Sequence, residues 1–561
     1  MKTPLESASP LRRALLIFAG ALLLRAGYLL LISRTACLDI NLDPISDMEA
    51  FHRWALTIAG GDWLGRGDFH PFHPWQIAVA TKQQWSLWYG HVFHQEPFYP
   101  YLVAAIYLLA PREPFSVIVV QMLLGAAGCA LTYLAARRLA PEGAALAAGI
   151  LAVFYGPYLY YESLLLRDSF LIPLSALLLW LIGEAVARAD ARDGTERRWW
   201  GGVGLTCGIF YLTKASILPF FLLLLAWRWL AARRGSPTGP GRWSTILLLA
   251  AGFTVALAPA VARNLWVGAP PMKITTRGPI ELINGNNPWH GGIGWFDGND
   301  RRVSVYAHDT LLRADGRLVP TALSLLRDWS ARPLDLARLQ MVKAAYLFAP
   351  FEMPNNASYS YFRVNSALLR HGTLSFFWIS PLALAGLIES ARRWRVFIPV
   401  YLFLGSGIAI TVVFYVIARF RAPLMPAILV LAGLGLKSTL DYARRGRWRR
   451  FAVQGVMIGT ALALNMATSY PDRDLIRPQD HLISIQGYRT RGWIDAAIQE
   501  VETARRSFAD LTVFDKTAAS LYESQGRLPE AAAALRSAIV KDPADAQALR
   551  DLARLNQPPS P

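Results

Sequence analysis

The sequence is poor in charged residues for its length. Of its 561 residues, 17% are charged and 54% are hydrophobic, and the mean hydropathy is positive at +0.29. A soluble domain carries about 25% charged residues. The apolar residues stand in uninterrupted runs of about 20, the length that a helix needs to cross a bilayer core. The shortage of charge therefore excludes an ordinary soluble protein and predicts an all-α, polytopic membrane protein.

Cysteine is also scarce. Of the three cysteines, Cys129 and Cys207 fall inside apolar runs and Cys37 stands alone, so no disulfide framework is expected. Cys37 follows the first apolar run, where a lipoprotein would be processed. Arg34 occupies a position that such processing reserves for a small aliphatic residue, and further apolar runs follow. We therefore expect an uncleaved signal anchor.

Phosphate-binding loops for nucleotides are missing. The chain contains neither G-x-x-x-x-G-K-[ST] nor a G-x-G-x-x-G after a strand pattern. Direct use of ATP or of a nucleotide-sugar is therefore not expected. The net charge of +18 does not indicate nucleic acid binding either, because the basic clusters lie between the apolar runs. Cytoplasmic loops of membrane proteins carry such clusters.

The basic clusters orient eleven expected spans. Arg12-Arg13 precedes the first run, 14–32, and places the N-terminus inside. The C-terminus is then outside, as are two long segments, 33–114 and 263–373. All nine histidines fall in the segments placed outside, although these are also the largest polar segments. The other expected spans are 115–134, 143–158, 164–186, two short runs that meet at 213–214, 245–261, three runs between 374 and 440, and 451–466.

The chain divides into a membrane domain, 1–470, and a C-terminal part, 471–561, that is Ala-rich and charged. Gly492, Ala497 and Ala504 recur 34 residues later as Gly526, Ala531 and Ala538. This period resembles that of tetratricopeptide repeats. Only about two units are visible where three are usual, so we expect them to pack on the membrane domain or on a protein partner. A plain amphipathic tail is the alternative.

Six sequence blocks, in order, resemble a known family. "SDMEAFHRWALTIAGGDWL" is similar to the first outer loop of GT-C type glycosyltransferases that use a polyprenyl-phosphate sugar, such as protein O-mannosyltransferases and aminoarabinose transferases. The resemblance covers about residues 14–436 and implies a GT-C fold. The other blocks are "HQEPFYPYLVAAIYLLA", "YYESLLLRDSF", "PAVARNLWVG", "INGNNPWHGG" and "ARFRAPLMPAILVLAGLGL".

The resemblance implies which side chains carry the chemistry. Transfer of a sugar with inversion requires a carboxylate that accepts the proton of the acceptor hydroxyl, and by resemblance this base is Asp47. Glu49 would support it from the next helical positions, as would the acidic residues Glu96 and Glu162. The competing interpretation is that Ser46 and Asp47 merely cap a helix that starts near Met48. The residues implied as acceptor or sugar contacts are His52, Asn286 and Asn287.

Outward-facing cations at span ends are the candidates for the lipid phosphate, because negative charge develops there as the phosphate leaves. They are Lys214, Arg263, Arg419 and Arg421. A cation at a span end is also commonly an interfacial anchor. Arg167 and Asp168 stand at the start of the fourth expected span, and the simple interpretation is that they pair with each other.

Two His-x-x-His pairs suggest a metal site. They consist of His70 with His73 and of His91 with His94, and four imidazoles could hold a divalent metal. Prolines interrupt the first pair, and hydrogen-bonded surface histidines are commoner. No cofactor is therefore certain, and a divalent metal is an alternative.

The sequence predicts an enzyme of the bacterial inner membrane with its C-terminal repeats in the periplasm. Its expected partners are a polyprenyl-phosphate-linked sugar, a protein or glycolipid acceptor, and membrane lipids, with no nucleic acid. Two other functions compete with this one. A lipid or sugar transporter or flippase would show charges in mid-span and repeated halves, and a non-catalytic envelope scaffold would need fewer spans.

Overall fold

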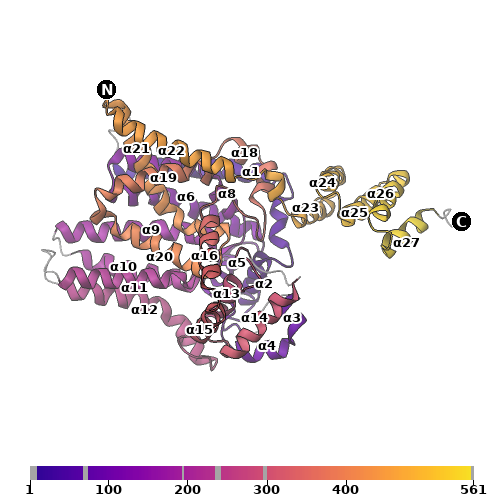
Figure 1. The fold of residues 1–561 in the computed structure, drawn as a ribbon, viewed down its shortest axis with the longest axis horizontal. Helices are drawn as coiled ribbons and strands as arrows, with labels where there is room; N and C mark the ends of the chain where they lie inside the picture. The colour runs from indigo at the N-terminus through magenta and orange to yellow at the C-terminus, as the bar shows by residue number, and fades with distance from the viewer. Residues whose placement is uncertain (1–8, 67–73, 192–194, 234–241, 295–299, 557–561) are drawn as a thin grey trace.

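The apolar runs form long helices that lie side by side in one bundle (Figure 1). The computed structural model describes residues 9–66, 74–191, 195–233, 242–294 and 300–556. Seven helices in these ranges are long and apolar enough to cross a membrane, which confirms the all-α membrane fold. They are α1 (Pro10–Ile32), α6 (Pro114–Leu139), α9 (Arg167–Ala191), α12 (Arg242–Trp266), α20 (Trp394–Val413), η3 with α21 (Ala418–Leu424 and Met425–Arg444) and α22 (Trp448–Thr468).

The other four predicted spans coincide with shorter helices, so the total of eleven stays a prediction. Three of these helices have 12 to 16 residues, and the fourth, α10 (Glu196–Thr213), has 18 and begins with three charged residues, Glu196, Arg197 and Arg198. They are α7 (Glu142–Val153), α10 (Glu196–Thr213), α11 (Leu218–Arg233) and α19 (Phe376–Ala391).

The third predicted run, 143–158, is not one continuous helix. It ends as α7 at Val153, and a separate helix, α8 (Gly156–Glu162), follows. Pro157 lacks the N–H that would continue the first helix, and the backbone of Tyr155 instead pairs with Leu374 in an isolated bridge. The break brings Glu162 back into the bundle, where it pairs with Arg25 of α1 at 2.7 Å.

Helices α10 and α12 approach each other closely through glycines. A Cβ on Gly204 would lie 2.0 Å from the carbonyl oxygen of Leu249, and one on Gly252 would lie 2.3 Å from that of Gly201. Small residues at helix contacts permit this approach in membranes, where dispersion contacts replace the hydrophobic effect as the driving force. The contact matters for the site because α10 ends one residue before Lys214.

The two long segments between spans form short helices at one end of the bundle (Figure 1). They contact each other directly: Phe93 of the first pairs with Thr275 of the second in an isolated bridge, and Trp85 packs with Ile283. The first holds η1 (Cys37–Leu42), α2 (Asp47–Ala59), α3 (Pro74–Val79), α4 (Lys82–Tyr89) and α5 (Phe98–Leu109). The second holds α13 (Arg277–Asn286), α14 (Arg301–Ala314), α15 (Leu318–Trp329), α16 (Pro333–Leu347), α17 (Tyr359–Val364) and α18 (Ala367–His371).

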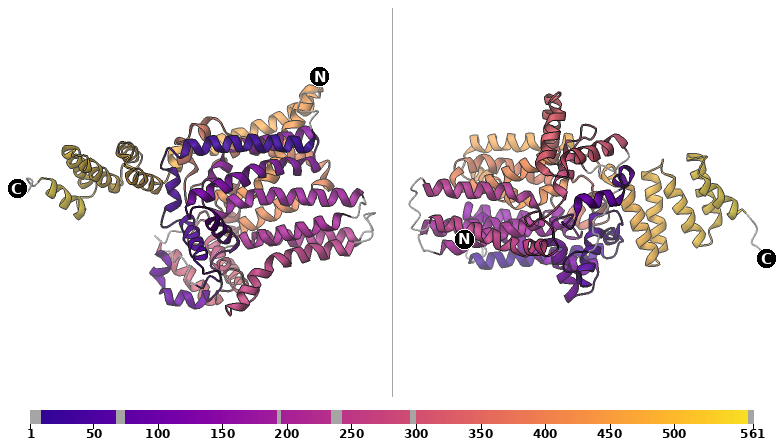
Figure 2. Two further views of the ribbon diagram at one scale, coloured as in Figure 1. Left: turned by 180° about the vertical axis from the view of Figure 1, so that it is seen from behind. Right: turned by 90° about the horizontal axis from the view of Figure 1, so that it is seen from below.

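The C-terminal helices extend from the same end of the bundle, as all three views show (Figures 1 and 2). Helix α24 (Ile494–Ser507) begins and ends 34 residues before α26 (Leu528–Lys541), and α25 (Thr512–Ser524) begins 34 residues before α27 (Ala546–Leu555). Ala497, Ala504, Ala531 and Ala538 are fully buried between them. The assignment to tetratricopeptide repeats stays a prediction. The helices are α23 (Pro478–Thr490), α24 (Ile494–Ser507), α25 (Thr512–Ser524), α26 (Leu528–Lys541) and α27 (Ala546–Leu555), after η4 (Asp472–Leu475).

Candidate active site

Asp47 is the first residue of α2, and its carboxylate faces away from the capping position. Ser46 caps the helix instead, accepting a hydrogen bond from the Glu49 amide at 3.2 Å. The Asp47 carboxylate is thereby left to other partners. Arg419 donates to Oδ2 at 2.6 Å, and the Asn356 side-chain amide donates to the same oxygen at 2.9 Å.

The surroundings of Asp47 keep it ionised. Burial raises the pKa of this carboxyl, but the positive charges of Arg419 and Arg277 and the Asn356 hydrogen bond outweigh burial and hold the pKa well below its usual range. Gln95 adds a longer contact, from Nε2 to Oδ1 at 3.4 Å. The site therefore presents a fixed carboxylate at neutral pH.

A chain of alternating charges runs from Asp47 into the protein. The Arg419 guanidinium lies 3.9 Å from the Asp168 carboxylate, and Asp168 lies 3.5 Å from Lys214. Asp168 therefore does not pair with Arg167, which contacts Glu96 instead. The reason is the direction of consecutive side chains, which point about 100° apart on the α9 helix.

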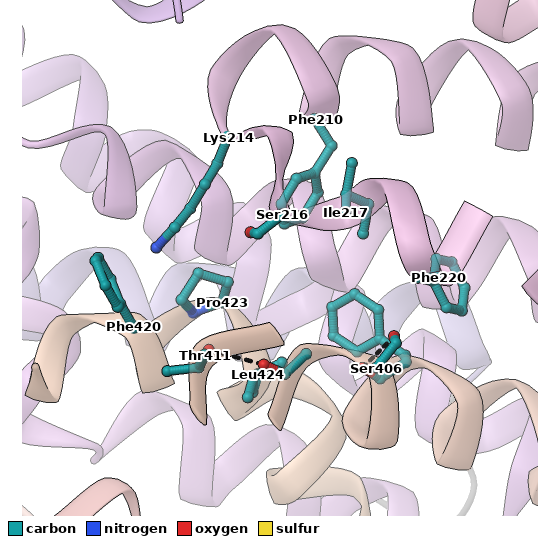
Figure 3. A pocket seen from close by; sticks show the side chains of 12 residues that line it. Phe210, Lys214, Ser216, Ile217, Phe220, Ser406, Thr411, Phe420, Pro423 and Leu424 are labelled. Atoms are coloured by element: carbon teal, nitrogen blue, oxygen red, sulfur yellow. Dashed lines mark hydrogen bonds between the residues drawn. The ribbon is translucent and has the colours of Figure 1, made fainter. Parts of the chain in front are cut away.

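Lys214 follows the last residue of α10 and points across a gap toward Phe420 of η3, with Nζ 3.5 Å from the ring centre (Figure 3). Burial lowers the pKa of this amine, Asp168 raises it, and Arg167 and Arg419 lower it, to a value of about 8. An anion placed beside Lys214 would restore its charge, because an opposite charge favours the protonated form.

Glu96 joins the first outer segment to α9 and to η2 (Ala215–Ile217). One carboxylate oxygen accepts from Arg167, and the other accepts from the backbone N–H of Ala215 at 3.0 Å. Burial raises the pKa of Glu96, but Arg167 and the Ala215 backbone N–H lower it by more than burial raises it. The carboxylate is therefore ionised. Glu96 thus contacts Arg167 and Ala215 rather than Asp47, and its supporting role stays a prediction.

A cavity of about 830 Å³ opens beside Lys214. Its walls come from the ends of α10 and α20, from η2 (Ala215–Ile217) and from the segment around α13. Phosphate groups suit the cations in this lining, and apolar chains suit its apolar side chains. The cations are Arg167, Lys214, Lys273, Arg277 and Arg317; the acids are Glu96, Glu281 and Asp315; the apolar residues include Leu218, Pro219, Met272, Ile274, Leu318, Ile410, Phe414 and Phe420.

Arg277 lines the cavity, and its charge acts on Asp47, whose pKa it helps to lower. It lies 2.5 Å from Glu281. It was not identified from the sequence as a site residue. The only signal in the sequence is its position shortly before the "INGNNPWHGG" block. Asn356, which was also missed, stands in a run of Asn and aromatic residues, "NNASYSYF", that has no helical period.

Two of the four cations that were predicted to bind the lipid phosphate, Arg421 and Arg263, instead donate hydrogen bonds to backbone carbonyl oxygens. Arg421 donates to the carbonyl oxygen of Ala349 at 2.7 Å and pairs with Glu352 at 2.5 Å. Arg263 donates to the carbonyl oxygens of Leu64 and His91 at 2.7 and 2.5 Å. Both arginines brace the outer segments against the bundle.

The supporting residues near Asp47 lie in separate environments. Glu49 points away from Asp47 on α2 and pairs with Arg53 at 2.6 Å. The His52 ring nitrogen Nδ1 lies 2.7 Å from the Tyr107 hydroxyl, so it fixes α2 on α5. Glu162, bound to Arg25 inside the bundle, does not contact Asp47.

Asn286 and Asn287 act as structural hydrogen-bond partners at the end of α13. Asn286 donates to the carbonyl oxygens of Leu282 and Val413, each at 2.8 Å. Asn287 donates to that of Val303 at 3.0 Å. Neither is among the described residues that line the cavity.

The histidine pairs do not assemble a metal site within the described part of the chain. His91 is exposed and His94 is buried, and no group of three His, Cys, Asp or Glu side chains in the described ranges is arranged to hold a metal ion. His70 and His73 lie outside the described residues.

One family of known proteins matches part of this chain. Residues 94–266 match the sequence model of the dolichyl-phosphate-mannose-protein mannosyltransferase family. The matched segment is therefore similar to a family of glycosyltransferases. The match confirms the resemblance seen in the sequence blocks, and it includes Glu96, Asp168 and Lys214 but not Asp47 or Arg419. No protein with a curated description matches the sequence.

Three of the solved structures with a similar backbone course are of the oligosaccharyltransferase of Archaeoglobus fulgidus. The apo form is 15% identical, with a TM-score of 0.46 over 86% of this chain and 57% of that one. The complex with an inhibitory peptide and a dolichol-phosphate is 16% identical, with a TM-score of 0.40 over 82% and 56%. The complex with Zn and sulfate is 14% identical, with a TM-score of 0.40 over 80% and 52%. This chain thus spans little more than half the length of those proteins.

Proposed function

We propose that this chain is a membrane-embedded glycosyltransferase of the bacterial inner membrane. It transfers a sugar from a polyprenyl-phosphate carrier to a hydroxyl of a protein or envelope glycolipid, on the outer side and with inversion. The observation that carries the proposal is the ionised Asp47, linked through Arg419, Asp168 and Lys214 to a cavity that is lined by both cations and apolar side chains.

In the proposed reaction the acceptor oxygen attacks the anomeric carbon opposite the phosphate. The bond between that carbon and the phosphate oxygen breaks, and the bonding electrons leave with the phosphate. Asp47 accepts the hydroxyl proton, and Lys214 and Arg277 stabilise the charge that develops on the phosphate. No general acid is required, since a lipid phosphate leaves as an anion.

The low pKa of Asp47 is compatible with a role as base. Arg277 contributes to that low pKa and also lines the cavity. A phosphate bound in the cavity would neutralise part of the positive field that acts on Asp47. The carboxylate would then become more basic once the donor is bound, which is the state in which it must accept a proton.

The first test is Asp47→Asn in purified, reconstituted protein supplied with a polyprenyl-phosphate sugar. We expect transfer to fall by roughly 10²- to 10⁴-fold, the usual contribution of a general base, with donor binding retained. Glu49→Gln is the matched control, because Glu49 lies on the same helix and pairs with Arg53. Turnover of Asp47→Asn equal to that of the unmodified protein would refute this base.

The competing functions make different predictions. A flippase would move labelled lipid across proteoliposomes without removing its sugar, and a scaffold would act through its C-terminal helices alone. Mass spectrometry of periplasmic proteins and envelope lipids, with and without the protein, would show which acceptor lacks a sugar. A missing sugar on a protein or on a glycolipid would decide between the two acceptor classes.

A further inference from the structure

Two residues at the start of α23, Arg477 and Asp480, bind a loop of the membrane domain, residues 355–358. Arg477, the residue before α23, donates through its guanidinium to the backbone carbonyl oxygens of Asn355 and Asn356, the latter at 2.6 Å. Asp480, one turn later and fully buried, accepts from Arg477 at 2.7 Å and from the Ser358 hydroxyl. The loop is thus held by a planar guanidinium and a buried carboxylate.

The same loop contacts the proposed base. The side chain of Asn356 donates from Nδ2 to Asp47 Oδ2 at 2.9 Å, and its Oδ1 accepts from the Asp47 backbone N–H at 3.4 Å. Arg477 therefore holds the main chain of Asn356, while the side chain of Asn356 holds Asp47. Two segments 430 residues apart in the numbering, at 47 and 477, are joined through one asparagine.

The geometry of this junction favours precise positioning over simple attachment. A guanidinium fork fixes direction as well as distance, since its donors lie in one plane. From the bundle side, the Tyr160 hydroxyl donates to the carbonyl oxygen of Ala357 at 2.8 Å. Loss of Arg477 would release the carbonyl groups of Asn355 and Asn356, while the Asp480 bond to Ser358 and the Tyr160 bond to Ala357 remain. A displacement of about 1 Å at a reacting group can cost about 100-fold in rate.

We propose that Arg477 is a positioning residue for Asp47, acting through Asn356, so that the C-terminal helices complete the active site. This inference rests on the proposed role of Asp47 as the base. It assigns to the C-terminal unit a part in the transfer step in addition to any part in binding a partner. A ligand or partner protein that shifts α23 would then change the rate of transfer.

The test compares Arg477→Ala with Arg491→Ala in the full-length reconstituted protein. Arg491 follows the same helix and also contacts the membrane domain, at Asp39 (2.9 Å) and at the Thr35 carbonyl oxygen (3.2 Å), but not at the 355–358 loop. We expect Arg477→Ala to lower kcat by about tenfold or more with the KM for the donor unchanged. Arg491→Ala should keep the kcat of the unmodified protein.

A second variant separates positioning from folding. Asn356→Ala leaves the backbone carbonyl that Arg477 binds, so the junction stays intact while the link to Asp47 is lost. We expect it to lower kcat as Arg477→Ala does, with a smaller loss of unfolding temperature than Arg477→Ala, which leaves the buried Asp480 carboxylate without its cation. The double variant should be no slower than either single variant, because both act on one path. The inference would be overturned if the fold-decrease in kcat of the double variant equalled the product of the two single decreases. An unchanged kcat in Asn356→Ala would overturn it as well.

The outcome for Asp47→Asn distinguishes the two proposals. If that variant keeps full turnover, the proposed base is wrong, and the inference that rests on it is overturned as well. If Asp47→Asn is inactive while Arg477→Ala and Asn356→Ala keep full kcat, the proposed function stands and only the positioning role fails.

Discussion

Asp47 acquires its chemical character from side chains that lie far away in the sequence. Arg419 and Asn356 bind its carboxylate, and both belong to the second half of the chain. A carboxylate at a helix start is commonly a cap, but the neighbouring Ser46 performs that role here. Because Ser46 satisfies the helix amide, Asp47 is available for a reacting group.

Lys214 makes the proposed reaction sensitive to pH on the alkaline side. Its pKa of about 8 means that the amine is mostly charged below pH 8 and mostly neutral above it. Donor binding requires the charge, so kcat/KM for the donor should fall as the pH rises from 7 to 9. Since kcat/KM reports the free enzyme, the fall should be weaker in kcat.

The control for this pH dependence is Lys214→Arg. A guanidinium remains charged throughout this range, so the alkaline fall in kcat/KM should disappear even if the absolute rate is lower. A measured kcat/KM that is flat between pH 7 and 9 in the unmodified protein would contradict the role given to Lys214.

At the scale of elements, the packing of α10 on α12 determines where Lys214 lies. Gly204→Ala would place a Cβ 2.0 Å from the Leu249 carbonyl oxygen, and such overpacking costs about 1–3 kcal/mol. We expect a lower unfolding temperature and a raised KM for the donor. Gly201→Ala is the control in the same helix, because its Cβ meets nothing within 4 Å; a similar loss in that variant would argue against this contact.

At the scale of the whole molecule, the two long outer segments and the C-terminal helices gather at one end of the bundle (Figure 1). The proposed site lies where these parts meet. This arrangement fits the expected orientation, in which the donor and acceptor are met outside the membrane.

The orientation can be tested by labelling single cysteines with a membrane-impermeant maleimide in spheroplasts. Asp510→Cys, exposed between α24 and α25, should be labelled in intact cells, whereas Arg445→Cys, exposed between α21 and α22, should be labelled only after lysis. The native cysteines are all buried and should not react with the maleimide. The reverse pattern would invert the predicted topology.

The sequence by itself determined the all-α membrane architecture, because the length and spacing of apolar runs follow from the bilayer. It also indicated the 34-residue period of the C-terminal helices and selected Asp47, Glu96 and Lys214. Each of these three lies in or beside the cavity and its chain of charges. Their roles in catalysis are proposals that the variants above test.

Only the tertiary structure decided which charges meet. Arg419 and Arg421 look alike in the sequence, yet one binds Asp47 and the other binds Glu352. They lie two residues apart in η3, and a helix with three residues per turn points such side chains in different directions. Arg25 and Glu162, 137 residues apart, pair for a similar reason: the chain breaks at Pro157 and returns into the bundle. Local patterns contain no information on partners so distant, because packing alone brings them together.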